Sequence, residues 1–318
     1  MIEVKNLVKK YGNHLAVDHL DFSLEPGKIY GFLGPNGAGK STTMNIMTGY
    51  LGATEGTVLI DGHDILKEPE EAKKHIGYLP ELPPLYMDMT VQEYLEFAAE
   101  LKKLPKDKRQ SEINEVIKLA RLQDVAPRLI KNLSKGYKQR VGLAQAILGF
   151  PDIIILDEPT VGLDPKQIVE IRELIRTLAQ KHTVILSSHI LAEVREVCDY
   201  ILIISKGKLV ASDTPENLEL LRNGASSLEI EAKANPETVR AILSTIDDIG
   251  TMELHVEDEN LTRAKIETKN GADIREAVFY AFAEEKCPLL EMKTDKASLE
   301  EIFMELTQKE ETSDAGNL

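Results

Sequence analysis

The fold is decided by one loop, which reads Gly34-Pro35-Asn36-Gly37-Ala38-Gly39-Lys40-Ser41-Thr42. The apolar run from Ile29 to Leu33 precedes it and predicts a buried strand, and the residues from Thr43 to Gly49 predict a helix. A strand, this glycine-rich loop and a helix in that order form the phosphate-binding P-loop pattern. Its glycines let successive backbone N–H groups surround a phosphate, and the N-terminus of the helix adds partial positive charge.

Two side chains of this loop carry expected roles. Lys40 is expected to reach the β- and γ-phosphates of a nucleotide, and the Ser41 hydroxyl is expected to bind Mg²⁺. The alternative is a glycine-rich turn without a ligand, which the complete pattern disfavours. The loop alone indicates a nucleotide, but neither which nucleotide it is nor what work is done.

A pair of acids ends a second apolar strand, Ile153 to Leu156. A strand buried in a parallel sheet delivers its terminal side chains to the cleft at the carboxyl edge of the sheet. Asp157 is therefore expected to supply a second Mg²⁺ contact, and Glu158 could act as the general base for an attacking water. A solvated turn with two acids is the alternative, and the P-loop elsewhere in the chain makes it the weaker one.

Composition bounds the class of protein. With 318 residues, 42% hydrophobic and 29% charged, the chain is long enough for two domains with substantial cores. It has no run of 18 uncharged apolar residues. Its first residues lack a basic region and a long apolar stretch, so no secretory leader is expected, and its two distant cysteines are expected to be small buried side chains in a reducing cytoplasm. The net charge is −15, and from Leu221 onward 22 acidic residues face 11 basic ones, which argues against a general nucleic-acid binder.

The order of predicted elements indicates an α/β core followed by a smaller α+β domain. Strands at 2–8, 17–24 and 56–62 predict an antiparallel sheet, and a helical insert runs from the capping box at Thr90 to about Gly149. Further core elements are expected at 165–179, 183–189 and 200–205. After Leu221 the order is β-α-β-β-α-β, the split ferredoxin-like order, with elements at 227–232, 236–246, 251–256, 261–268, 272–285 and 289–293.

These elements divide the chain into expected domains. The core is expected at 1–220 with its helical subdomain at about 84–150, and an accessory domain at 221–307. The accessory domain is expected to end in a helix from Ser298 to Thr307, followed by a disordered tail at 308–318.

A third motif, Leu133-Ser134-Lys135-Gly136-Tyr137-Lys138-Gln139-Arg140, leads into a helix. Physical reasoning alone favours an ordinary helix capped by Ser134. The set of motifs, however, resembles the ATP-binding subunit of ABC transporters, because all of them arrive in that family's order. They are Tyr11, the P-loop, Gly77 to Glu81, Ser134 to Gln139, Asp157 to Thr160, Gly162-Leu163-Asp164 and His189, and they cover residues 1 to about 215.

The resemblance implies roles for individual residues. Tyr11 is similar to the aromatic that stacks on adenine, Glu81 stands at the Q-loop position, and His189 resembles the switch histidine near the γ-phosphate. Ser134 and Gly136 belong to the signature and Asp164 to the D-loop. In that family the ATP sites lie between two subunits, so Ser134 and Gly136 of one chain are expected to complete the site that begins at Lys40 of the other.

The chain departs from the family pattern at two places. Glu81 replaces the usual glutamine, which adds negative charge beside the phosphates, and Lys135 and Tyr137 depart from the usual Leu-Ser-Gly-Gly-Gln signature. Signatures of this Ser-Lys-Gly kind are similar to those of the ABC-2 type exporter branch. The stretch from Leu133 to Gln145 is most similar to the gliding-motility type.

The resemblance implies an ATPase that uses ATP and Mg²⁺, pairs across the ATP site with a second copy, as a homodimer, or with another ABC ATPase subunit, and powers export through a separate transmembrane permease. Such a subunit is expected to be cytoplasmic and peripheral on the inner face of the cell membrane. The helical insert and the loop from Pro80 to Met89 form the expected docking surface. The alternatives are a soluble ABC ATPase acting on a ribosome or chromosome complex, a module that holds ATP without turnover, and a GTPase, for which the chain lacks an Asn-Lys-x-Asp guanine reader.

Overall fold

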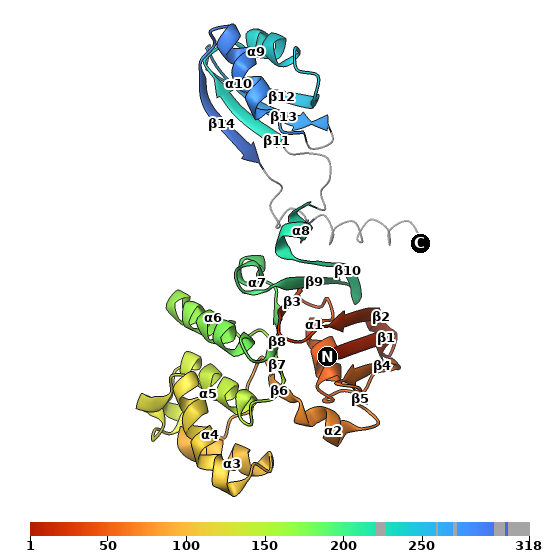
Figure 1. Ribbon diagram of the computed structural model, residues 1–318, viewed down its shortest axis with the longest axis vertical. Coiled ribbons are helices and arrows are strands. Elements are labelled where there is room, and N and C mark those ends of the chain that lie inside the picture. The colour runs from red at the N-terminus through yellow and green to blue at the C-terminus, as the bar shows by residue number, and fades with distance from the viewer. Residues whose placement is uncertain (221–226, 259, 270–271, 296–302, 305–318) are drawn as a thin grey trace. The chain divides into compact units, whose positions relative to one another are not determined.

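The computed structural model describes residues 1–220, 227–258, 260–269, 272–295 and 303–304. The chain divides into two compact units, Met1–Pro215 and Glu216–Leu318 (Figure 1). The sequence analysis placed its division at residues 220 and 221. Each unit has its own core and is described by itself.

An antiparallel sheet opens the first unit. Its strands stand in the order β2-β1-β4-β5, with bounds β1 Ile2–Tyr11, β2 His14–Leu24, β4 Glu55–Ile60 and β5 His63–Asp64. Asp61 and Gly62 join β4 to β5, and both have positive φ, 49° and 87°. Those angles match a two-residue type I′ hairpin turn, the turn that an Asp-Gly pair favours.

A second, six-stranded sheet positions the site. Its order is β10-β9-β3-β8-β7-β6, and all its pairs are parallel except that between β9 and β10. The strands are β3 Ile29–Leu33, β6 Ile76–Leu79, β7 Ile153–Leu156, β8 Thr183–Ser188, β9 Tyr200–Ser205 and β10 Lys208–Asp213. Every residue of β3, β7 and β8 is buried, as expected for strands covered on both faces. The loops after these three strands therefore meet at one edge of the sheet.

Helices of the first unit follow the strands that they connect (Figure 1). Helix α6 has the bounds that the sequence predicted, Pro165–Ala179, and its buried side chains recur at helical spacing. The other helices outside the helical insert are α1 Lys40–Met47, α2 Pro69–Lys74 and α7 Leu191–Val197, while α8 Pro215–Leu220 begins at the last residue of the first unit. The helix predicted from Thr43 thus begins three residues earlier, inside the P-loop.

The helical insert contains three helices between β6 and β7. They are α3 Val91–Leu101, α4 Lys106–Leu119 and α5 Lys135–Ile147, with 3₁₀ turns at Gln123–Val125 and Ile130–Asn132. The capping box predicted at Thr90 is present, because the Thr90 hydroxyl accepts from the Glu93 N–H at 3.2 Å while the Glu93 carboxylate accepts from the Thr90 N–H at 2.8 Å. Helix α5 packs against β6 so closely that a Cβ on Gly77 would lie 2.2 Å from the Ala146 carbonyl oxygen.

The second unit has the predicted β-α-β-β-α-β order. Its elements are β11 Ser227–Ala232, α9 Pro236–Leu243, β12 Ile249–Asp258, β13 Leu261–Thr268, α10 Arg275–Glu284 and β14 Leu289–Asp295. The sheet is antiparallel with the order β12-β13-β11-β14, so the first and third strands are central, as in the split ferredoxin-like arrangement. Buried Ile266 and Phe282 belong to its core. The predicted helix at 298–307 and the predicted tail at 308–318 lie outside the described residues, apart from 303 and 304.

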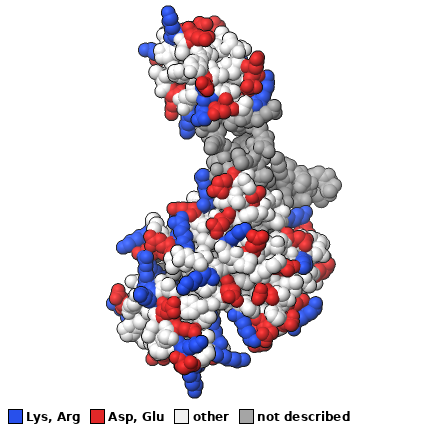
Figure 2. Space-filling model, viewed as in Figure 1, with Lys and Arg blue, Asp and Glu red and all other residues white. Residues whose placement is uncertain are grey.

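Two surface findings complete the description. Among the described residues, none of the helices combines the length and the apolar character that crossing a lipid bilayer requires. On the face shown in Figure 2, acidic and basic side chains are interspersed over the surface of each unit.

Candidate active site

The P-loop connects β3 to α1 and is built on unusual backbone angles. Gly37 has φ 82° and Gly39 has φ 105°, values that favour glycine over any residue with a side chain. A Cβ on Gly39 would also lie 2.5 Å from the Ala16 carbonyl oxygen of β2. The glycines thus serve conformation and close approach together, and the loop ends on the N-terminus of α1, where an anion is favoured.

Lys40 lies in the centre of the site and is held by its own loop. Its ammonium donates to the carbonyl oxygens of Gly34 at 2.8 Å and Pro35 at 3.2 Å, and it lies 3.7 Å from Glu158 Oε1. Burial lowers the pKa of Lys40, while the charges of Glu158 and Asp157 oppose that shift. The Lys40 ammonium is thus already in place inside the site, where it can neutralise the charge of incoming phosphates.

Asp157 follows β7 and lies beneath the loop. Its Oδ1 accepts from the Ser41 hydroxyl at 3.1 Å and from the Ser187 hydroxyl at 2.6 Å. A hydroxyl with carboxylate oxygens is the hard oxygen donor set that Mg²⁺ prefers, so Ser41, Asp157 and the nearby Glu81 fit that ion chemically. The described residues contain no group of three or more His, Cys, Asp or Glu side chains placed to hold a metal by themselves. Such an ion would need further oxygens, which a nucleotide's phosphates supply.

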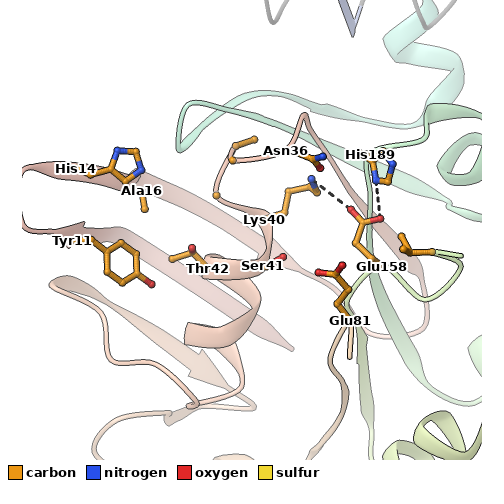
Figure 3. A pocket seen from close by; sticks show the side chains of 14 residues that line it. Tyr11, His14, Ala16, Asn36, Lys40, Ser41, Thr42, Glu81, Glu158 and His189 are labelled. Carbon is orange, nitrogen blue, oxygen red and sulfur yellow. Dashed lines mark hydrogen bonds and ion pairs between the residues drawn. The ribbon is translucent and has the colours of Figure 1, made fainter. Parts of the chain in front are cut away.

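Glu158 lies between two nitrogen-bearing side chains. Its Oε2 is 3.0 Å from His189 Nδ1, and its other oxygen faces Lys40 (Figure 3). The side chain is only 8% exposed, and the residue has φ 48°, an angle that costs about 1 kcal/mol or more for a non-glycine residue. Such strain persists only where surrounding contacts hold it, and here the Glu158 N–H donates to Ser187 Oγ at 2.8 Å.

These groups surround one cavity of about 510 Å³. That volume is in the range of small-molecule sites. Tyr11 and His14 lie on one side of the P-loop, and Glu158 and His189 lie on the other (Figure 3). The lining consists of Tyr11, His14, Ala16, Asn36, Gly37, Ala38, Gly39, Lys40, Ser41, Thr42, Glu81, Glu158, Val161 and His189. The structure therefore brings together residues from five separate sequence motifs.

Three lining residues were not singled out from the sequence. His14 is the partner of Tyr11 across the β1–β2 hairpin, and Ala16 follows on the same strand. Val161 follows Glu158 by three residues and leads into the Gly162-Leu163-Asp164 motif. The hairpin pairing of Tyr11 was the one available signal for His14, while Ala16 and Val161 carry no distinctive chemistry.

Six predicted residues do not line this cavity. Gly34 and Pro35 contribute carbonyl oxygens to Lys40, and Asp157 is covered by Ser41 and Ser187. The other three begin helices of the same chain: Ser134 caps α5, Gly136 lies in its first turn, and Asp164 caps α6. A Cβ on Gly136 would lie 2.6 Å from the end of the Gln167 side chain, so a larger residue there would displace that side chain of α6.

The carboxylate of Glu81 makes a testable contribution to this site. Glu81→Gln keeps a side-chain oxygen and removes one negative charge beside the phosphates, so we expect the KM for ATP to fall about fivefold, with kcat equal to the wild type or higher. Phosphate release measured against ATP and Mg²⁺ concentration tests this, with the exposed Glu71→Gln as a control. Loss of turnover in Glu81→Gln would instead show that the carboxylate is needed.

Comparison with known proteins gives a consistent result. A family model described as ABC transporter matches residues 17–161. An ABC transporter ATP-binding protein of Bacillus subtilis (strain 168), itself uncharacterised, is 35% identical over 99% of both chains. The bacitracin transport ATP-binding protein of Bacillus licheniformis is 33% identical, over 96% of this chain and 97% of its own length.

Solved structures match about two thirds of the chain. The ATP-binding subunit of an ABC transporter is similar at 31% identity with a TM-score of 0.63, covering 69% of this chain and 92% of that one. A dimeric ATP-binding cassette in a post-hydrolysis state with ADP and Pi is similar at 27% identity and a TM-score of 0.62, covering 67% of this chain and 98% of that one. These matches confirm the predicted P-loop nucleotide-hydrolase fold.

Proposed function

The chain belongs to the ATP-binding subunits of ABC transporters, and from that premise we propose that it powers export through a separate membrane-spanning permease. Members of this family bind and hydrolyse ATP, and the cavity at the P-loop is the place for that reaction. The observation that carries the proposal is the placement of Lys40, Glu158 and His189 around that cavity. Relatives of known role include a bacitracin transport protein, a linearmycin resistance protein and a Nod factor export protein, which favours export over a soluble role at ribosomes or chromosomes.

In the proposed mechanism the loop binds the phosphates and positions them for attack. Backbone N–H groups from Asn36 to Lys40 and the N-terminus of α1 receive the β- and γ-phosphates, and Lys40 neutralises their charge. Tyr11 packs on the adenine. Ser41, Glu81 and Asp157 would hold Mg²⁺, which neutralises the charge that develops on the phosphate oxygens.

Glu158 is the proposed general base. Its carboxylate takes a proton from the attacking water, the water oxygen bonds to the γ-phosphorus, and the bond to the β-phosphate oxygen breaks to release ADP and inorganic phosphate. His189 holds the carboxylate through Nδ1 and faces the γ-phosphate with its ring. Burial of Glu158 keeps bulk water from competing for the same oxygens.

A second copy of the chain is proposed to close the site. Ser134 and Gly136 open α5, a helix of 13 residues, and they do not line the cavity of their own chain. Helix N-termini attract phosphate, so this end of α5 in one copy is proposed to meet the γ-phosphate held by Lys40 in the other, with Asp164 beside it. ATP then favours the paired state, and hydrolysis lets the two copies separate. ATP thus binds the paired state more tightly than the separated one, and this difference in affinity can drive a conformational cycle.

The permease is proposed to dock at a groove beside the loop from Pro80 to Met89, on the inner face of the membrane. The groove has a volume of about 660 Å³ and is lined by Tyr50, Ile76, Tyr78, Pro80, Glu81, Leu82, Pro84, Lys102, Gln145, Ala146 and other residues. Tyr50 and Leu82 are 82% and 78% exposed, an unusual exposure for large apolar side chains. Because Ser41 and Glu81 line both the groove and the ATP cavity, a partner in the groove would contact the site through these two residues.

Tyr50→Glu tests this docking. The charge in an apolar groove should weaken binding to membrane vesicles that contain the permease by about tenfold or more, while phosphate release in solution stays at the wild-type level. Val169→Glu, on the exposed face of α6, is the matched control and should bind as the wild type does. Equal vesicle binding by both variants would contradict the docking proposal.

A further inference from the structure

The two segments that carry Glu158 and His189 leave neighbouring strands and must keep a fixed relation. Glu158 follows β7 and His189 follows β8. Ser187 makes one link between the two segments, because its hydroxyl contacts Asp157 Oδ1 at 2.6 Å and the Glu158 N–H at 2.8 Å. Ser187 is the second-last residue of β8, and its two contacts are the first two residues after β7. The residues that follow Glu158 therefore need another contact to fix their position relative to His189.

Glu193 on α7 makes a second link beyond the reacting groups. Its Oε2 accepts from the Thr160 hydroxyl at 2.6 Å and from the Ser188 hydroxyl at 3.2 Å. Ser188 Oγ in turn accepts from the Ile190 N–H at 3.0 Å, on the far side of His189. One carboxylate oxygen therefore joins the residue two positions after Glu158 to the residue directly before His189.

Glu193 is placed to hold the two segments together and not to contact the nucleotide. The residue is only 8% exposed and does not line the ATP cavity. Thr160 and Ser188 are also buried, at 7% and 1%. A buried carboxylate is costly unless its oxygens are satisfied, so this arrangement strongly favours one relative placement of the two segments.

We propose that Glu193 is a positioning residue that holds the Glu158 carboxylate and the His189 ring in register for hydrolysis. The inference rests on the roles proposed above for Glu158 and His189. Glu158 has a strained φ of 48°, which must be held by contacts on both sides of it. Ser187 supplies the contact before the turn, and Glu193, through Thr160, supplies the one after it.

Size-matched variants without the hydrogen-bonding groups separate positioning from folding. Thr160→Val and Glu193→Met should each lower kcat about tenfold and leave the KM for ATP within about twofold, because neither residue contacts the nucleotide. Thr160→Ser restores the hydroxyl and should restore kcat. The double variant Thr160→Val with Glu193→Met should lose little more than the worse single variant, since both remove one link. Glu196→Met, on the same helix but paired with Arg172, is the matched control and should keep wild-type kcat.

The outcomes distinguish this inference from the proposed function. If Glu158→Gln stops hydrolysis while Thr160→Val and Glu193→Met turn over like the wild type, the positioning role is wrong and the site assignment stands. Additive losses in the double variant, or a loss in Glu196→Met equal to that in Glu193→Met, would also overturn it. If Glu158→Gln hydrolyses ATP normally, the site assignment itself fails. A melting temperature for each variant identifies any that do not fold, and Thr160→Val, which keeps the Glu193–Ser188 contact, is the milder probe.

Discussion

The Glu158→Gln variant is expected to release phosphate at about one hundredth of the wild-type rate or less. The amide has the size of the carboxylate but cannot accept a proton from the attacking water, and losing a general base costs roughly 10²- to 10⁴-fold. The geometry supports this role, because the carboxylate is buried between Lys40 and His189 at the cavity wall. Phosphate release at saturating ATP measures the effect, with the exposed Glu173→Gln as a control.

The same variant should accumulate as an ATP-bound dimer. Hydrolysis normally ends the paired state, so a chain that binds ATP without cleaving it should remain paired. Size exclusion with light scattering, with and without Mg²⁺ and ATP, reports this directly. A variant that stays monomeric with ATP, or turns over near the wild-type rate, would show that Glu158 is not the base.

Lys40→Ala is expected to lower ATP affinity by at least about a hundredfold. The change removes the buried cation and leaves the carboxylates of Glu158 and Asp157 facing the incoming phosphates without compensation. Breaking a buried charge pair in this way costs about 3 kcal/mol or more, which corresponds to a factor of 100 or greater in the dissociation constant.

Calorimetric titration with a slowly hydrolysed ATP analogue measures that loss. Lys74→Ala removes a lysine that is exposed and paired with Glu71, so it should bind the nucleotide as the wild type does. Unchanged melting temperatures would show that the loss belongs to the site. Normal ATP binding by Lys40→Ala would contradict the assignment of the loop.

Strong local signals explain why most of the fold could be predicted from sequence. The run from Ile29 to Leu33 is apolar without interruption and is β3, and Asp164 with Pro165 marked the start of α6. In the second unit the alternation from Leu261 to Thr268 matched β13 at both ends. In each case residue type, spacing and boundary signals agreed, which makes a prediction reliable.

Two of the elements that were missed, α7 and β10, lacked those signals. Helix α7 has seven residues, and the residue before it, Ile190, provides no side-chain cap. Strand β10 follows the turn at Lys206 and Gly207, but it has no clear alternation and lies at the sheet edge. Helix α2 did have Pro69 at its start and acids in its first turn, so that signal was available and was not used.

The site residues could be predicted where a sequence motif indicates their chemistry. The P-loop, the acids after β7 and His189 line or support one cavity, while His14, Ala16 and Val161 depend on strand pairing and chain reversal. Irregular pairing between β1 and β2 makes that register hard to read from sequence. Glu193 was not singled out either, because one glutamate on a short helix is typical of a solvated face. The roles of Ser134, Gly136 and Asp164 stay a proposal, since one chain does not contain their contacts.

The central claim is that ATP joins two copies and that each copy completes the other's site. A crystal structure of Glu158→Gln grown with Mg²⁺ and ATP tests it most directly, through the distance from Ser134 Oγ to the γ-phosphate bound by Lys40 of the other copy. The account predicts hydrogen-bonding distance, about 3 Å, in both sites of a two-fold pair. A nucleotide-bound structure in which Ser134 lies far from every γ-phosphate would contradict it.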